Sequence, residues 1–261
     1  MAVPDRIPVP QHGARRFARR ATLRRAAGLL NDFRFEQTDP DRFYSALARD
    51  SVELIADLYP DPLEGAVVVD VGGGPGYFAD GFRARGARYV SVEPDPAEMH
   101  AAALPHQASI RASGMDLPFA GGSMDVCFSS NVAEHVPDPW RMGSEMLRVT
   151  RSGGIMVLSY TLWYGPFGGH EMGLTHYLGG ARAARRYTRR HGHPPKNLYG
   201  TSLFAVTAVD GLRWAATIGA DEATLIAAFP RYLPRWMWWV MRVPGLRELL
   251  GSNLVLVFRR T

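Results

Sequence analysis

The sequence predicts an α/β fold with a doubly wound, largely parallel sheet, and three observations favour it. Strand-like and helix-like segments alternate between residues 66 and 161. The first of them, 66–71, reads AVVVDV and is apolar apart from its aspartate, as expected of a strand covered on both faces. It runs directly into a glycine-rich turn that opens a helix, which is the arrangement of a βα unit.

The composition is that of a large folded domain. The chain has 261 residues, 46% of them hydrophobic, which is enough to bury one core with an appended element. The net charge of +5 comes from arginine, because Lys196 is the only lysine. No apolar run of about 18 residues and no signal-peptide segment is present, so we expect a cytoplasmic protein. The single cysteine, Cys127, fits a reducing compartment and is expected to be buried.

The first 60 residues are predicted to form an N-terminal basic helical extension, with the main domain at 61–261. Residues 1–13 are rich in proline and predict a mobile lead. Paired arginines and interleaved apolar residues predict one basic amphipathic helix over 14–30. An apolar stripe through 39–58 predicts a second helix, which Pro60 ends.

The rest of the alternating pattern can be placed along the chain. Helices are expected at 76–86 and 138–150, and further strands at 88–93, 108–112, 124–130 and 154–161.

The glycine-rich turn carries the first indication of a ligand. A dinucleotide fingerprint starting at Gly72 would need a glycine at position 77, where Tyr77 stands instead. With Asp70 included, the spacing is DxGxGxG, which S-adenosyl-L-methionine enzymes use, through Gly72, Gly74 and Gly76. Glycines let the backbone approach a ligand, amides at the helix start can bind the cofactor carboxylate, and Asp70 can bind its ammonium. The alternative is a tight turn without a ligand.

A carboxylate at the end of the next strand supports the same cofactor. Glu93 follows the first glycine by about 20 residues, the position from which an acid accepts hydrogen bonds from both ribose hydroxyls. The alternative is a solvated acid at a strand end.

The region 66–160 resembles the class I S-adenosylmethionine-dependent methyltransferases of the type 11 group. The resemblance rests on ASGMDLPF (112–119) and SSNVAEHVPDPWRMGSEMLRVTRSGG (129–154). It implies a Rossmann-like fold with seven strands, an adenine site bordered by Ser113, Gly114 and Met115, and Asn131 near the methionine moiety. One departure is Ser113, since the family usually has aspartate there and a hydroxyl is a weaker partner for the adenine amino group.

The catalytic group is expected on loops after the fourth and fifth strands, where methyl transfer to a hydroxyl needs an aligned nucleophile and a base. Glu134 and His135 follow the fourth strand, and the fifth is followed by an insertion at about 162–200 that carries His170, Glu171 and His176. We predict His170 as the base, oriented by a neighbouring carboxylate, with His135 second. The alternatives are that His135 caps a helix and that His176 is a core residue. A metal site of His170, Glu171 and His176 matches no zinc spacing, so we expect no metal.

The C-terminal part combines tryptophan with arginine. In this fold the last two strands form an antiparallel hairpin, here 221–229 and 252–259, with an insertion at about 230–250. Trp236, Trp238 and Trp239 lie there between arginines, which predicts contact with an anionic membrane, helped by the N-terminal arginines. The alternative is that the tryptophans pack on the sheet. Nucleic acid is not expected, because no stacking platform or RNA module is recognisable.

Nearly the whole chain is similar to a group of actinobacterial methyltransferases from mycolate-producing bacteria that is associated with cell-envelope lipid assembly. The resemblance implies O-methylation of a lipid-linked or glycolipid acceptor at the inner face of the membrane. Two alternatives remain: methyl transfer to carbon, as in the cyclopropane synthases that share this cofactor fold, and a non-catalytic cofactor-binding scaffold.

Overall fold

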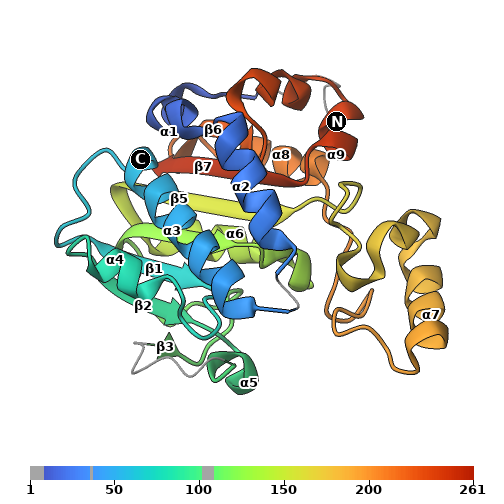
Figure 1. Ribbon diagram of the computed structural model, residues 1–261. Coiled ribbons are helices and arrows are strands. Elements are labelled where there is room, and N and C mark those ends of the chain that lie inside the picture. Colours follow the sequence, from blue (N-terminus) through green and yellow to red (C-terminus); the bar gives the residue numbers. More distant parts are fainter. Residues whose placement is uncertain (1–8, 36–37, 102–108) are drawn as a thin grey trace.

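The computed structural model describes residues 9–35, 38–101 and 109–261. Its centre is a seven-stranded sheet in the order β3-β2-β1-β4-β5-β7-β6. Strand β7 runs antiparallel to both of its neighbours, and the pairings among β1 to β5 are parallel. Helices lie on both faces (Figure 1). The predicted α/β fold with a mostly parallel seven-stranded sheet is therefore confirmed.

Most strands agree with the predicted segments to within one or two residues, and two differ more: β5 begins four residues before the predicted 154, and β3 is shorter than predicted. The strands are β1 Val67–Val71, β2 Arg88–Val92, β3 Ser109–Ile110, β4 Met124–Ser130, β5 Thr150–Thr161, β6 Ala223–Pro230 and β7 Asn253–Arg260. Strand β3 covers only part of the predicted 108–112 and lies at the sheet edge, where it pairs with β2 alone. Residue 108 lies outside the described ranges.

The helices precede the first strand, fall between the strands, or lie in the two predicted insertions. They are η1 His12–Ala14, α1 Arg15–Arg20, α2 Leu23–Phe33, α3 Pro40–Leu58, α4 Ala79–Arg83, α5 Pro96–Met99, η2 Ala133–His135, α6 Pro139–Val149, η3 His170–Leu178, α7 Gly180–His191, α8 Ala208–Thr217, η4 Arg235–Arg242 and α9 Leu246–Leu250. Helix α4 is shorter than predicted, because Gly76 has a φ of 88° and helical geometry cannot begin until after it.

Alternating side chains of the sheet build two separate cores. In β4, Val126 and Phe128 join the core under α1, α3 and α4, whereas Cys127 joins the core under α6 and α8. Successive side chains of a strand point to opposite faces, so this alternation is what a sheet covered on both sides requires. Cys127 is fully buried, as predicted.

The predicted single helix over 14–30 is wrong. Helix α1 ends at Arg20, and α2 begins at Leu23 as a new helix. The break lies at Thr22, whose extended backbone lets its hydroxyl accept a hydrogen bond from the Arg25 amide and cap α2. Part of the predicted mobile lead, residues 1–8, lies outside the described residues.

A buried ion pair joins the N-terminal helices to the sheet. Arg231, at the end of β6, is 1% exposed and donates to the Asp50 carboxylate of α3 at 3.1 Å and to the Ser130 hydroxyl at the end of β4 at 2.8 Å. Arg25 of α2 donates to the same carboxylate at 2.6 and 2.7 Å. Burial alone would raise the pKa of Asp50, but the two guanidinium groups lower it below its ordinary value. The predicted domain division at residue 61 stays a prediction, although α3 shares a core with the sheet.

The segment after β5 stands at one side of the sheet, with α7 at its outer end (Figure 1). It has a small core of its own, made by Trp163, Met172, Ala183, Ala184 and Leu203. The predicted insertion therefore packs mainly on itself, and its first residues stay beside the carboxyl end of β5.

The three tryptophans of η4 do not share one surface. Trp238 is 3% exposed and stacks on Phe229 at a centroid distance of 4.8 Å, and its indole donates to the Leu233 carbonyl. The prediction that Trp238 contacts a membrane is therefore wrong. Trp236 and Trp239 are 67% and 52% exposed. In the described part of the chain, no helix combines the length and apolarity needed to cross a membrane.

Candidate active site

The turn after β1 needs glycine for its backbone geometry. Gly72, Gly74 and Gly76 have φ values of 78°, 51° and 88°, a region that side chains disfavour. Gly73 has an ordinary φ, but a Cβ there would lie 2.7 Å from Asp70 Oδ2. The alternate glycines thus allow a left-handed backbone at every second position, and the amide of Gly72 ties the turn to the Val92 carbonyl at the end of β2.

Two carboxylates flank this turn. Asp70 is buried at the end of β1, and Tyr89 donates a 2.6 Å hydrogen bond to its Oδ2. Burial raises the pKa of Asp70 to about 7, although this hydrogen bond opposes the shift. Glu93 follows β2, and its two oxygens accept from the amides of Gly74 at 3.2 Å and Asp95 at 3.1 Å. Burial likewise raises the pKa of Glu93. Both acids lie where the prediction put them, at the carboxyl ends of adjacent strands.

The segment predicted to border adenine lies beside the end of β1. A Cβ on Gly114 would lie 2.8 Å from Cγ1 of Val71, so only glycine fits this close approach. The hydroxyl of Ser113 accepts from the Met115 amide at 3.1 Å and is thereby engaged within its own turn. The roles of these three residues stay predictions.

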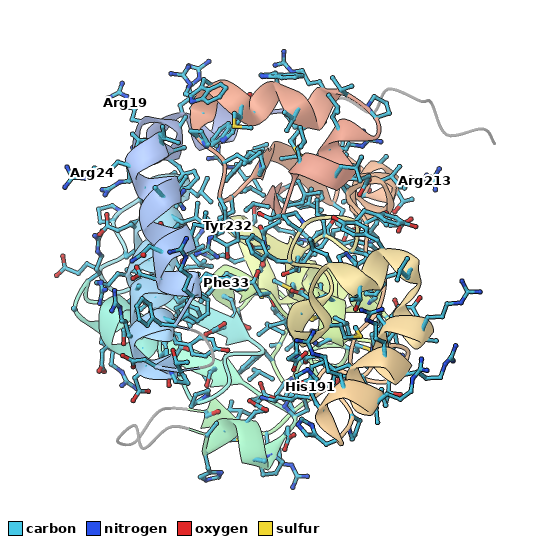
Figure 2. The ribbon with its side chains drawn as sticks, turned by 45° about the vertical axis from the view of Figure 1, so that its right-hand side comes forward. Arg19, Arg24, Phe33, His191, Arg213 and Tyr232 are labelled. Atoms are coloured by element: carbon cyan, nitrogen blue, oxygen red, sulfur yellow. The ribbon has the colours of Figure 1, made fainter. Side chains whose placement is uncertain are left out.

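Asn131 occupies a constrained position directly after β4. Its φ is 57°, unusual for a residue with a side chain. Its Oδ1 accepts from Nδ2 of Asn253 at 2.7 Å, and its Nδ2 donates to the Tyr232 hydroxyl at 3.3 Å. Tyr232 lies between α2 and the C-terminal elements (Figure 2). Sequence reasoning missed Tyr232 and Asn253, because they lie more than 100 positions away and carry no motif.

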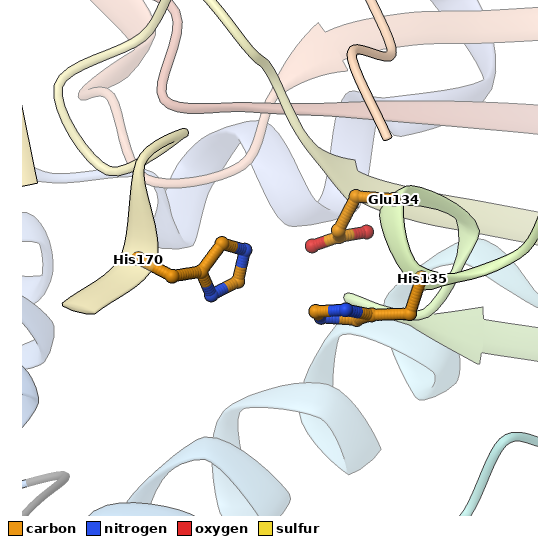
Figure 3. A group of neighbouring side chains, drawn as sticks. All are labelled: Glu134, His135 and His170. Atoms are coloured by element: carbon orange, nitrogen blue, oxygen red, sulfur yellow. The ribbon is translucent and has the colours of Figure 1, made fainter. Parts of the chain in front are cut away.

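Three residues from two loops meet at the carboxyl ends of β4 and β5. Glu134 and His135 come from η2 and His170 begins η3, and one potential ligand atom of each lies within 4.8 Å of the others (Figure 3). The rings of His135 and His170 are 5.0 Å apart between centroids. The predicted first and second histidines are thus neighbours, and the acid beside them is Glu134. We call these three residues the Glu-His-His cluster.

Hydrogen bonds fix two members of the cluster from behind. Nδ1 of His135 donates to the Ser202 carbonyl at 2.7 Å, which leaves the lone pair on Nε2. Oε1 of Glu134 accepts from the Thr161 amide at 3.1 Å, whereas its buried Oε2 has no protein partner. The backbone carbonyl of Glu134 also accepts from Phe204, so the end of the insertion holds η2 in place.

His170 is held in a strained, half-buried position. Its φ is 46°, and its buried Nε2 has no hydrogen-bond partner in the described structure. Burial, with smaller contributions from His135 and His176, lowers the pKa of His170 to about 3. The ring is therefore neutral at physiological pH. It has a lone pair available but is a weak base.

The other two predicted catalytic residues make different contacts. Glu171 accepts from the amide and side chain of Asn197 at 3.3 and 2.9 Å. His176 is 1% exposed, donates from Nδ1 to the Gly173 carbonyl and packs edge-on against Trp163. The carboxylate grouped with His170 is therefore Glu134, and His176 has the contacts of a core histidine. The catalytic roles of all four residues stay predictions.

Comparisons with known proteins agree with this architecture. Residues 69–158 match the family described as "Methyltransferase domain". A protein of Mycobacterium sp. (strain JLS) named "Uncharacterized methyltransferase" is 67% identical over 249 residues, covering 93% of this chain and 97% of the relative. A protein of the same name from Mycobacteroides abscessus is 63% identical over 254 residues, covering 93% and 96%.

Solved structures show the same fold at low identity. Geranyl diphosphate C-methyltransferase from Streptomyces coelicolor A3(2), in a complex that contains S-adenosyl-L-homocysteine, superposes with a TM-score of 0.51, 16% identity and coverage of 81% of this chain and 78% of that one. An S-adenosylmethionine-dependent methyltransferase from Mesorhizobium loti gives a TM-score of 0.52, 18% identity and coverage of 83% and 98%. Another geranyl diphosphate methyltransferase structure, a complex with S-adenosyl-L-methionine, superposes with a TM-score of 0.52 at 17% identity. The chain therefore belongs to the class I S-adenosylmethionine-dependent methyltransferases.

Proposed function

We propose that the protein transfers the methyl group of S-adenosylmethionine to an oxygen atom of a lipid-linked or glycolipid acceptor. The observation that carries this proposal is the Glu-His-His cluster. Its first member, Glu134, lies three residues beyond Asn131, and the cluster as a whole occupies the loops that follow β4 and β5. Oε2 of Glu134 and Nε2 of His170 have no hydrogen-bond partner there. Ligands of open α/β sheets bind outside the carboxyl ends of the strands, so the acceptor belongs on this side.

Methyl transfer to a hydroxyl releases one proton as well as S-adenosylhomocysteine. The acceptor oxygen forms a bond to the methyl carbon while the bond between that carbon and the sulfonium sulfur breaks, and S-adenosylhomocysteine leaves. The proton of the acceptor hydroxyl must also leave, and the Nε2 lone pair of His135 is available to take it. Burial raises the pKa of Glu134, while His135 opposes this shift, and the ionised form of Glu134 would stabilise the resulting imidazolium.

The exposed surface of the N- and C-terminal elements supports a lipid acceptor. Leu23 and Leu30 of α2 and Trp236 and Trp239 of η4 are large apolar side chains exposed by half or more. A hollow of about 320 Å³ between α1 and η4 is lined by Gln11, Arg15, Ala18, Arg19, Arg235 and Trp238. Exposed aromatic residues together with arginine are typical of surfaces that bind anionic lipid.

The arginines of this surface are free to attract anions. Arg15, Arg19 and Arg24 form no salt bridge with any described residue, and Arg19 and Arg24 project away from the body (Figure 2). Arg20 and Arg25 are engaged by acids of α3 and contribute less. We place the protein at the cytoplasmic face of the plasma membrane, where anionic headgroups attract basic segments.

The test is a methylation assay with a mycobacterial lipid extract and methyl-labelled S-adenosylmethionine. We expect release of S-adenosylhomocysteine and one lipid that gains the mass of one methylene. The carbon-13 chemical shift of the labelled methyl separates an oxygen-bound product from a carbon-bound one. No release above the extract-free control would contradict catalysis on these lipids, and a carbon-bound label would favour carbon methylation.

A further inference from the structure

The Glu-His-His cluster has the donor set of a metal site. Two imidazoles and one carboxylate offer ligand atoms that all lie within 4.8 Å of one another, and in Figure 3 the His170 ring points toward the Glu134 carboxylate and His135. An ion bonded to nitrogen and oxygen at about 2.0–2.2 Å brings its ligand atoms to about 3.3 Å from one another. Small side-chain rotations would close the remaining gap.

Two of these atoms lack the partners that buried polar atoms require. Oε2 of Glu134 and Nε2 of His170 are buried and accept no hydrogen bond in the described structure. Most buried polar atoms in proteins are hydrogen-bonded, and an orphan points to a missing water or ion. A cation between the three side chains would satisfy both atoms.

The surroundings orient the ligands in the way that metal sites do. His135 donates from Nδ1 to the Ser202 carbonyl, so its Nε2 is the free nitrogen. Oε1 of Glu134 is anchored by the Thr161 amide, so its Oε2 is the free oxygen. In metal centres, a second hydrogen bond of this kind fixes the ring tautomer and the carboxylate orientation. Both anchors come from main-chain groups of other segments, so they hold the ligands rigidly.

From this arrangement we propose that Glu134, His135 and His170 bind a divalent transition-metal ion such as Zn²⁺. Imidazole nitrogen with one carboxylate suits zinc and its first-row neighbours, whereas magnesium and calcium prefer oxygen alone. Three protein ligands leave a coordination position open, which distinguishes a catalytic zinc site from a structural one.

At the open coordination position the ion could bind and activate the acceptor hydroxyl. This catalytic role, unlike metal binding itself, rests on the proposed function. In this route Nε2 of His135 is bonded to the ion, so the ion replaces His135 as the group that activates the hydroxyl. The acceptor oxygen would bind the ion, which lowers the pKa of the hydroxyl, so that the proton leaves to water and the oxygen attacks the methyl carbon as an alkoxide. The sulfonium bond breaks as before, and the ion is neither oxidised nor reduced.

The test measures metal binding by the full chain without any acceptor. The protein is stripped with a chelator, dialysed against Zn²⁺ or Co²⁺, and analysed for metal content and for the visible absorption of bound Co²⁺. We expect about one equivalent in the wild type and at least roughly a 100-fold weaker affinity in His135→Ala, His170→Ala and Glu134→Gln, as for the loss of a ligand from a three-ligand site. His191→Ala is the matched control, since His191 lies at the exposed end of α7 (Figure 2).

Titration with S-adenosylhomocysteine and thermal melting show whether each variant is folded. If the wild type retains no more metal than the three variants, or if the variants bind as the wild type does, the site is refuted. Loss of turnover in His135→Ala without metal in the wild type would leave the imidazole-base mechanism standing. Metal binding without methylation of any lipid would refute the proposed acceptor alone.

Discussion

The cofactor side and the acceptor side of the site differ in how completely the protein satisfies them. Around the glycine turn, Glu93 accepts two backbone hydrogen bonds and Asp70 accepts one from Tyr89. In the Glu-His-His cluster, two buried atoms have no partner. The two acids of the cofactor side therefore have partners within the protein, whereas the acceptor side has room for one more charged or hydrogen-bonding group. Substitutions on the two sides should accordingly affect different measurements.

The largest expected effect comes from the cluster. Replacing His170 by alanine should lower turnover by about 10²–10³-fold, because His170 would hold the ion that stabilises the acceptor oxyanion. The affinity for S-adenosylmethionine, measured by calorimetry, should stay unchanged because His170 is not on the glycine turn. His191→Ala should match the wild type in both. Unchanged turnover in His170→Ala would remove the residue from the mechanism.

The next largest effect is expected on the free energy of unfolding. It concerns the buried ion pair of Asp50 and Arg231, which belongs to neither the cofactor side nor the acceptor side. Asp50→Asn leaves Arg231 buried without a counter-charge and should cost about 3–5 kcal/mol in the free energy of unfolding. The folded protein lowers the pKa of Asp50. The pair therefore stabilises the protein at pH values above the ordinary pKa of an aspartate, and this stabilisation is lost as the pH falls through the lowered pKa. Urea unfolding at neutral and acidic pH measures both.

Glu53→Gln serves as the control for Asp50→Asn. Glu53 pairs with the exposed Arg20 and Arg85, and such surface pairs contribute about 1 kcal/mol or less. Equal losses of unfolding free energy in the two variants would show that the buried Asp50 pair stabilises the protein no more than an exposed pair does.

A smaller effect is expected on the cofactor side. Glu93→Gln keeps the shape of the side chain but loses the charge that accepts from ribose hydroxyls, which costs about 1.5–3 kcal/mol, or roughly a 10- to 100-fold weaker affinity for S-adenosylhomocysteine. Metal binding by the cluster should be unaffected. Glu64→Gln, at an exposed position, should change neither. An unaltered cofactor affinity in Glu93→Gln would contradict the ribose role.

The smallest effect concerns the lipid surface. Trp236→Ala and Trp239→Ala should each weaken binding to anionic vesicles by about 1–2 kcal/mol, since each removes a large apolar side chain. Added salt should weaken binding further through the arginines. Ile110→Ala, at the opposite edge of the sheet, is the control. If the wild type does not float with anionic vesicles at low salt, the membrane proposal fails.

The same contrast explains which parts could be predicted from the sequence. Asp70, the glycines and Glu93 lie close together in the chain, and their backbone requirements are written in the residue types themselves. The cluster instead joins residues that are far apart in the chain. The sequence predicts a carboxylate near His170 without specifying which one; in the fold Glu171 is hydrogen-bonded to Asn197, and Glu134 lies beside the ring. Local spacing does not encode such long-range contacts.

Two other errors have local explanations. Trp238 follows Trp236 by two positions and precedes Trp239 by one, so a helical segment cannot expose all three on one face, and one of them fills the space beside Phe229. The break at Thr22 was missed because the apolar spacing continues across it, although a threonine ahead of a helical segment is a common cap.

The most direct test of the division between the two sides is turnover of Glu134→Gln at saturating S-adenosylmethionine. Glutamine can still accept the hydrogen bond from the Thr161 amide but carries no charge. We predict a fall in turnover of about 100-fold or more with an unchanged dissociation constant for the cofactor. Turnover equal to that of the wild type would show that the chemistry at the acceptor does not depend on this carboxylate, and the account of the acceptor side would be wrong.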